Sequence, residues 1–166
     1  MGPAVKGFEE KFTQLHNFGH GVSSNSGSSA NLLAIAALAN AQTPNHLKPG
    51  DEVIVPALSW STTVWPLVQH NLVPVIVDID PRTFNIDPNE IERAIGPKTR
   101  AIMPVHVYGN PCDMNAINQI CIKHDLILIE DCCEALGAEY ENKPVGSFGV
   151  AGTFSFYFSH HMTTLE

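Results

Sequence analysis

Five runs of apolar residues, each about as long as a β-strand, recur along the chain. They cover residues 52–56, 73–78, 101–107, 126–129 and 152–156. Several are apolar at successive rather than alternate positions, which is typical of strands buried on both faces of a parallel sheet. The pattern therefore predicts a sheet that helices cover on two sides.

Polar segments between these runs carry helix start signals. Asp87 precedes Pro88 and stands three residues before Glu90, which predicts an N-cap, a first helical residue and a capping box. Asp113 is likewise placed to cap a helix over residues 114–123. The resulting alternation predicts an α/β fold with right-handed crossovers. Ligands bind such open sheets beyond the carboxyl ends of the strands.

Composition and charge narrow the class of protein. The 166 residues are 44% hydrophobic and 8% aromatic, as in a soluble globular domain. A net charge of -8 disfavours binding to nucleic acid or to an anionic membrane surface. No apolar run approaches the roughly 20 residues that span a bilayer, and the first residues lack the apolar core of a signal peptide. We therefore expect a cytoplasmic protein.

The cysteines and histidines do not predict a disulfide or a metal site. Cys112, Cys121, Cys132 and Cys133 form no paired CxxC clusters, so free buried thiols are expected. The eight histidines are scattered apart from His160-His161, which leaves a metal ion without a set of ligands.

A serine-rich turn precedes an apolar helix predicted over residues 30–38. The turn reads Ser26-Gly27-Ser28-Ser29. Free amides and the positive dipole end at a helix start form a phosphate site, and Gly27 allows close backbone approach. An ordinary N-capped turn is the alternative. The chain has no GxGxxG motif and no P-loop lysine, which argues against a dinucleotide or ATP.

Two further candidates follow predicted strands. Trp60 comes after the strand ending at Pro56, where a flat side chain can lie against a cofactor ring or pack in the core. Asp131 follows the run 126–129, and a carboxylate at a buried strand end needs a cationic partner or several hydrogen bonds. A protonated pyridine nitrogen is such a partner, and a helix-capping role is the alternative.

Together with the run Phe154 to Thr164, these segments resemble the DegT-type sugar aminotransferases, which use pyridoxal 5'-phosphate (PLP) and have fold type I. The resemblance covers almost the whole chain. It implies that residues 1–166 form the large PLP-binding domain, incomplete and truncated before the small C-terminal domain. It further implies a phosphate site made by the amides of Gly27, Ser28 and Ser29 and the Ser155 hydroxyl, with Trp60 stacked on the pyridine ring and Asp131 paired with its nitrogen.

The residue that departs from the family pattern is His160. Most of the family carries a lysine at the matching position and links PLP to it, whereas no lysine follows Lys143 here. Histidine cannot form that link, so we expect PLP to bind without a covalent bond and His160 to act as a general base. A shift of one residue would exchange His160 with His161. Glu134 is expected to face the cofactor's phenolic oxygen or the base, with a solvated helix position as the alternative.

The histidine replacement resembles the sugar-nucleotide 3-dehydratase branch of the family. That resemblance implies a nucleotide-linked 4-keto-6-deoxyhexose as substrate, GDP-linked with CDP-linked sugars as the rival. Glutamate would be the amino donor that generates pyridoxamine 5'-phosphate. A conventional aminotransferase using another lysine, such as Lys143, and an inactive fragment or scaffold remain alternatives. The family is homodimeric, so an intact protein is expected to form a homodimer. An incomplete sheet would expose a strand edge and promote aggregation.

Overall fold

A computed structural model describes residues 2–163. Its helices are α1 (Pro3–His16), α2 (Gly27–Leu38), α3 (Ser61–Gln69), α4 (Pro88–Ala94) and α5 (Met114–His124), with a 3-10 turn η1 at Val107–Gly109. Its strands are β1 (Glu52–Pro56), β2 (Val73–Val77), β3 (Thr99–Ile102), β4 (Ile127–Asp131), β5 (Glu139–Tyr140), β6 (Lys143–Pro144) and β7 (Ala151–Thr153). No helix in the described range is long and apolar enough to cross a membrane.

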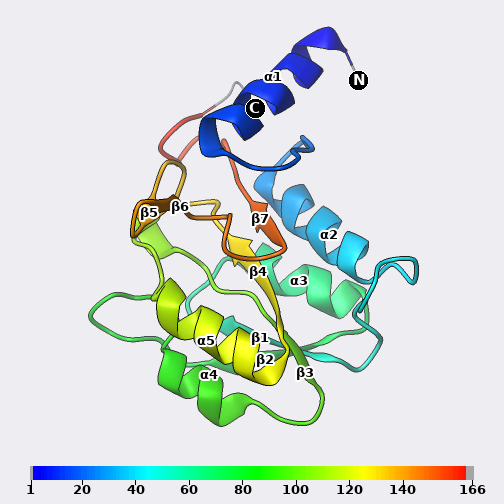
Figure 1. Ribbon diagram of the computed structural model, residues 1–166, viewed down its shortest axis with the longest axis vertical. Coiled ribbons are helices and arrows are strands. Elements are labelled where there is room, and N and C mark those ends of the chain that lie inside the picture. Colours follow the sequence, from blue (N-terminus) through cyan, green and yellow to red (C-terminus); the bar gives the residue numbers. More distant parts are fainter. Residues whose placement is uncertain (1, 164–166) are drawn as a thin grey trace.

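Five strands form one parallel sheet in the order β2-β1-β3-β4-β7. Helices α2 and α3 pack on one face, and α4 and α5 on the other (Figure 1). A small antiparallel hairpin of β5 and β6 lies outside this sheet. The predicted α/β alternation is therefore a three-layer arrangement with the sheet in the middle.

Alternate residues of β1 fill two separate cores, which explains its unbroken apolar sequence. Val53 and Val55 pack toward α2, where they share a core with Ile35. Ile54 points to the other face and shares a core with Ile117 of α5. All five side chains are completely buried, and each such burial contributes roughly 1.5–3 kcal/mol. The helices are held to the sheet mainly by this apolar packing.

The predicted strand bounds are confirmed for β1, whereas β2 ends one residue early, β4 is shifted by one to two residues, and two other strands end well before the apolar runs do. The run 101–107 is a strand only as far as Ile102, because Pro104 lacks the N–H that a ladder needs. The run 152–156 is a strand as far as Thr153. The apolar residues beyond both ends form loops, and these loops bound the cavity described below.

The predicted helix caps are confirmed, although the capping box is not formed. The Asp87 carboxylate accepts the Asn89 amide at 2.8 Å, and Asp113 caps α5 through the Ala116 amide at 3.0 Å. The Asp87 amide donates to the Asp78 carbonyl oxygen at 3.2 Å. The amide that a capping box would offer to Glu90 is therefore already used. The Glu90 carboxylate instead forms an ion pair with Arg93, three residues later.

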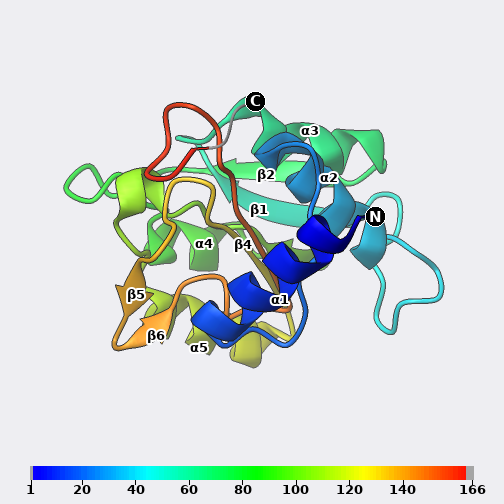
Figure 2. The same cartoon turned by 90° about the horizontal axis from the view of Figure 1, so that it is seen from above.

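Helix α1 is attached to the rest of the molecule by aromatic side chains. None of its residues is fully buried. Phe8 packs edge-on against Phe156 with ring centroids 5.5 Å apart, and Phe12 packs against Phe154 at 5.3 Å. Figure 2 shows α1 lying near the segment that follows β7. The first and last described segments are thus joined by one aromatic cluster.

Candidate active site

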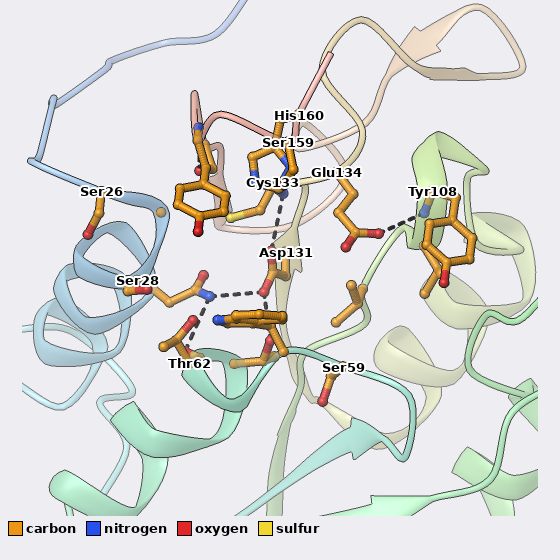
Figure 3. A pocket seen from close by; sticks show the side chains of 18 of the residues that line it. Ser26, Ser28, Ser59, Thr62, Tyr108, Asp131, Cys133, Glu134, Ser159 and His160 are labelled. Carbon is orange, nitrogen blue, oxygen red and sulfur yellow. Dashed lines mark hydrogen bonds between the residues drawn. The ribbon is translucent and has the colours of Figure 1, made fainter. Parts of the chain in front are cut away.

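A cavity of about 560 Å³ lies beyond the carboxyl ends of β1, β3, β4 and β7 (Figure 3). Strand β2 lies on one side of β1, and β3, β4 and β7 lie on the other, so the strand order reverses beside this cavity. Such a reversal is where open α/β sheets bind ligands. The lining residues come from five segments: Ser26, Gly27, Ser28 and Asn31; Leu58, Ser59, Trp60, Thr62 and Thr63; Val105, Val107 and Tyr108; Asp131, Cys133 and Glu134; Ser155, Tyr157, Ser159 and His160.

The start of α2 forms one wall of the cavity. The helix begins at Gly27, three residues before its predicted start, and Ser26 is its N-cap. Gly27 and Ser28 therefore lie in the first turn, where amides have no partner within the helix. Ser29 is not among the lining residues, and its amide donates to the Ser26 hydroxyl oxygen at 3.2 Å. Its predicted role as a phosphate ligand stays a prediction, and it requires Ser26 to release that amide.

Gly27 permits a close contact between α2 and the loop after β7. A Cβ at this position would lie 2.7 Å from Ser155 Cβ and 2.9 Å from Cys133 Sγ. Ser155 is buried, and its hydroxyl oxygen accepts the Tyr157 amide at 3.2 Å. The absence of a side chain at Gly27 thus brings the Ser155 hydroxyl beside the first-turn amides, and this combination fits a phosphate group.

Asp131 ends β4 as a buried carboxylate with 3% of its surface exposed. Its Oδ2 accepts hydrogen bonds from Asn31 Nδ2 and Thr63 Oγ1, each at 2.9 Å. Its Oδ1 accepts the Cys133 amide at 3.2 Å. A turn rather than a helix follows, so the helix-capping alternative is wrong. Oδ1 keeps acceptor capacity beside the cavity, which suits a cationic N–H donor.

Trp60 stands at the N-cap position of α3 with 69% of its surface exposed. The core alternative for this tryptophan is therefore wrong. Its indole contributes to the cavity wall, where it is available to contact a flat ligand.

His160 and His161 point to different places. The His160 amide donates to the Tyr157 carbonyl oxygen at 2.9 Å, and the two rings meet edge to face with centroids 5.8 Å apart. His160 is half-buried and lines the cavity. His161 is exposed, and its imidazole lies against Gly109, 3.3 Å from where a Cβ would be. The cavity thus receives the first histidine of the pair.

Glu134 bridges two loops at the cavity. It lies in the turn after β4, so the alternative of a helix position is wrong. Its Oε2 accepts the Tyr108 amide at 2.9 Å, as the dashed line in Figure 3 marks. Tyr108 has left-handed backbone angles, φ 53° and ψ 26°, which are uncommon for a residue other than glycine. The Glu134 carboxylate therefore holds the loop after β3 in an unusual conformation beside the ligand space.

Sequence reasoning missed the polar side chains behind Asp131. Asn31, Thr63 and Thr153 are buried in or next to apolar segments, and only their hydrogen bonds reveal a role. Asn31 was the most visible of the three, since it is a lone amide in an apolar helix. Cys133 also lines the cavity, and burial together with the nearby Asp131 carboxylate raises the pKa of its thiol. The other cysteines are free and buried, as predicted.

These features fit the size and chemistry of PLP. The cavity is lined by first-turn amides and a hydroxyl, by a buried carboxylate with acceptor capacity, and by an exposed indole. A planar pyridinium ring with a phosphate arm needs these groups. None of the lining residues in the described part of the chain is a lysine.

A second cluster of polar side chains lies behind the sheet end. His106, Glu130 and Cys132 place possible metal ligands within 4.8 Å of one another. His106 Nδ1 accepts the Cys112 amide at 3.0 Å, so its Nε2 carries the hydrogen that faces Glu130 at 3.3 Å. The Glu130 carboxylate also accepts the backbone amides of Gly146, Phe148 and Gly149. These hydrogen bonds already occupy the atoms of His106 and Glu130 that could bind a metal ion. The cluster therefore serves as structural support.

Comparisons with known proteins agree with this geometry. GDP-4-keto-6-deoxy-D-mannose 3-dehydratase of Escherichia coli O55:H7 is 48% identical over 166 residues, which are 100% of this chain and 42% of that protein. A solved structure of the E. coli dehydratase with bound hydrated PLP matches at TM-score 0.95 and 48% identity, over 100% of this chain and 42% of that one.

An aminotransferase from Psychrobacter cryohalolentis matches less closely, at TM-score 0.90 and 34% identity, over 98% of this chain and 39% of that one. The chain thus spans less than half the length of these relatives. The α/β fold expected of the fold type I enzymes is confirmed by the structural matches. Since the family pattern matches residues 1–166 in full, the chain belongs to the DegT/DnrJ/EryC1/StrS aminotransferase family.

Proposed function

We propose that this chain carries the PLP site of a sugar-nucleotide 3-dehydratase and forms part of its large cofactor-binding domain. The observation that carries the proposal is the position of His160. His160 lines the cavity and occupies the sequence position at which most of the family carries a lysine. No lysine is among the described residues that line this cavity. The 48% identity to a dehydratase, against 40% to an L-glutamine:2-deoxy-scyllo-inosose aminotransferase, supports the same choice.

The residues around the cavity would hold PLP by non-covalent contacts. The amides of Gly27 and Ser28 and the Ser155 hydroxyl would bind the phosphate, with Ser29 as a further ligand if Ser26 releases its amide. Trp60 would stack on the ring, and Asp131 would accept a hydrogen bond from the ring nitrogen. When bound, PLP supplies an electron sink that stabilises negative charge developing on the carbon atoms attached to it.

His160 would act as the general base in this site. Its imidazole is half-buried at the cavity, and histidine takes up and returns protons near neutral pH. Glu134 is held by the Tyr108 amide with its carboxylate facing the same space, where it can hydrogen-bond to a phenolic oxygen or to the base. We propose that His160 takes up and returns the proton that moves in the reaction, and that Glu134 orients the group to which it hydrogen-bonds, either the phenolic oxygen of the cofactor or the His160 imidazole.

The proposed substrate is a nucleotide-linked 4-keto-6-deoxyhexose, GDP-linked as in the E. coli relative's name. Glutamate would be the amino donor. In the balanced reaction glutamate is oxidised to 2-oxoglutarate and releases ammonia, while sugar carbon 3 is reduced by exchange of its hydroxyl group for hydrogen. A lysine-linked aminotransferase would instead leave the amino group on the sugar.

Lys143, the nearest candidate for an alternative cofactor lysine, is poorly placed for that role. It lies in β6, and its ammonium group stands 4.2 Å from the centre of the Phe148 ring, a cation–π contact. It is not among the residues that line the cavity. This placement supports the dehydratase over an aminotransferase that uses another lysine.

We further propose that the complete protein is a homodimer. Large side chains that line the cavity are exposed, among them Trp60 at 69%, Tyr108 at 74% and Tyr157 at 45%. Exposed aromatic groups clustered around a ligand site are typical of surfaces that a partner covers. Light scattering at several concentrations would measure the state, and a monomer throughout would count against this part of the proposal.

The test compares two substitutions, His160→Gln and His161→Gln, with the unchanged chain. Each protein is incubated with PLP, glutamate and the GDP-linked 4-keto sugar, and ammonia, 2-oxoglutarate and the sugar product are measured. We expect a deoxygenated product and ammonia from the unchanged chain and from His161→Gln, and loss of both from His160→Gln. Borohydride treatment should attach no cofactor covalently. An amino-sugar product or covalent fixation would revive the aminotransferase, and failure to bind PLP would favour an inactive fragment.

A further inference from the structure

Asn31 connects four elements around the candidate site. It lies in α2 one turn after Gly27, so both residues occupy the same helix face and line the cavity. Its Nδ2 donates to Asp131 Oδ2 at 2.9 Å and to the Thr62 carbonyl oxygen at 3.3 Å. Its Oδ1 accepts the Thr153 hydroxyl of β7 at 2.6 Å. The side chain is 1% exposed and fully engaged in hydrogen bonds.

The neighbours of the Asn31 amide fix which way it points. Asp131 Oδ2 and the Thr62 carbonyl are acceptors only, so the NH2 group must face them and the oxygen must face Thr153. The Thr153 hydroxyl then has to donate to that oxygen. The network therefore has one direction, in which Thr153 donates to Asn31 and Asn31 donates to Asp131.

This direction determines which part of the Asp131 carboxylate remains available. Asn31 and Thr63 together occupy Oδ2, whereas Oδ1 accepts the Cys133 amide at 3.2 Å, and the Cys133 thiol lies beside the same carboxylate. A carboxylate oxygen accepts about two hydrogen bonds, so Oδ2 is full and Oδ1 has one site left. Because Asp131 lines the cavity, a bound ligand can reach that site.

We propose that Asn31, fixed by Thr153, is a positioning residue that presents Asp131 Oδ1 to the protonated ring nitrogen of PLP. This inference rests on the proposed function and deepens it. The same helix would then serve both ends of the cofactor, with its first turn at the phosphate and Asn31 behind the carboxylate that meets the ring. A lost hydrogen bond to a buried charge corresponds to about a tenfold loss of affinity or more.

The test measures binding of PLP and of its 1-deaza analogue, in which a carbon atom replaces the ring nitrogen. The unchanged chain should bind PLP more tightly than the analogue, because the analogue has no N–H for Asp131. Asn31→Leu and Thr153→Val should weaken PLP binding about tenfold and leave binding of the analogue unchanged. A merely structural effect would weaken both ligands equally.

Thr99→Val is the matched control for Thr153→Val. Thr99 is a buried threonine at the opposite end of the sheet, and its hydroxyl donates to Glu52 Oε2 at 3.2 Å. It should lower the urea midpoint as Thr153→Val does, without changing the preference for PLP over the analogue. Thr153→Val preserves side-chain shape, so it reports on the inference even if Asn31→Leu fails to fold.

The outcomes separate the two proposals. If the unchanged chain binds no PLP, or binds PLP and the analogue equally, the proposed cofactor role of Asp131 fails and the inference fails with it. If the unchanged chain prefers PLP and both variants keep that preference in full, only the positioning role of Asn31 and Thr153 is overturned.

Discussion

Replacing Gly27 by alanine is the sharpest test of how the phosphate end of the cavity is built. The added Cβ would lie 2.7 Å from Ser155 Cβ and 2.9 Å from both Ser155 Oγ and Cys133 Sγ. Carbon atoms in contact normally stay about 3.5–4.0 Å apart, so the overlap is close to an ångström. Either the start of α2 or the loop after β7 must move.

The expected magnitude follows from that overlap. Overpacking a buried site costs about 1–3 kcal/mol of unfolding free energy. Movement of the first turn away from Ser155 also costs hydrogen bonds to phosphate, and one charge-assisted bond of roughly 1.5–3 kcal/mol corresponds to about a ten- to hundredfold loss of cofactor affinity. Gly27→Ala should therefore lose both stability and PLP binding.

Gly7→Ala is the matched control, because Gly7 is also a helical glycine and a Cβ there meets nothing within 4 Å. Alanine should favour helix α1 by roughly 0.5–1 kcal/mol without affecting the cavity. Urea unfolding of each variant and titration with PLP, followed by visible absorption, measure both quantities. Equal stability and equal PLP affinity of the two variants would refute the close-contact explanation for Gly27.

Three further predictions concern other parts of the molecule. Trp60→Ala should weaken PLP binding roughly two- to tenfold and leave stability unchanged, whereas Trp65→Ala, also exposed but outside the cavity, should change neither; equal effects on PLP titration would reject stacking by Trp60. Gly146→Ala should lower the unfolding free energy by about 1–3 kcal/mol more than Gly50→Ala. Both glycines have positive φ, 87° and 88°, but only Gly146 has a neighbour at 2.6 Å, so matching urea curves would contradict this explanation. Burial raises the pKa of the Cys121 thiol to about 11, and the pKa values of the other three thiols are also raised. Thiol reagents should therefore react slowly with the folded chain at pH 8. After unfolding, they should react rapidly with all four cysteines. Since the unfolded chain loses its thiol protons first, stability should fall as pH rises from about 8.5 toward 11, and an unchanged urea midpoint over that range would contradict the burial.

The elements and part of the site could be predicted because their signals are local. Asp87 and Pro88 indicate the start of α4, and the continuous apolar run of residues 52–56 indicates β1. Asp131 and Trp60 were identifiable because each lies within a few residues of the end of a predicted buried strand, and parallel strands bring such positions together.

The remaining site residues could not be predicted because their roles depend on distant partners. Asn31 and Thr153 are ordinary polar residues in sequence, and only the pairing of α2 with β7 makes them neighbours. The choice between His160 and His161 depends on the turn at Tyr157, which the sequence does not specify. The start of α2 differed by three residues, and this shift separates Ser29 from the cavity lining.

The hydrogen bonds around Asp131 also determine when the site can form during folding. They join residues 68 and 100 positions apart, and the Thr153–Asn31 bond joins residues 122 positions apart. Contacts of such separation carry a large loop-closure entropy and form slowly. During synthesis, the ribosome must release Thr153 before Asn31 can be fixed. The helices and inner strands can form earlier, and a partly folded chain would possess them without possessing a cofactor site.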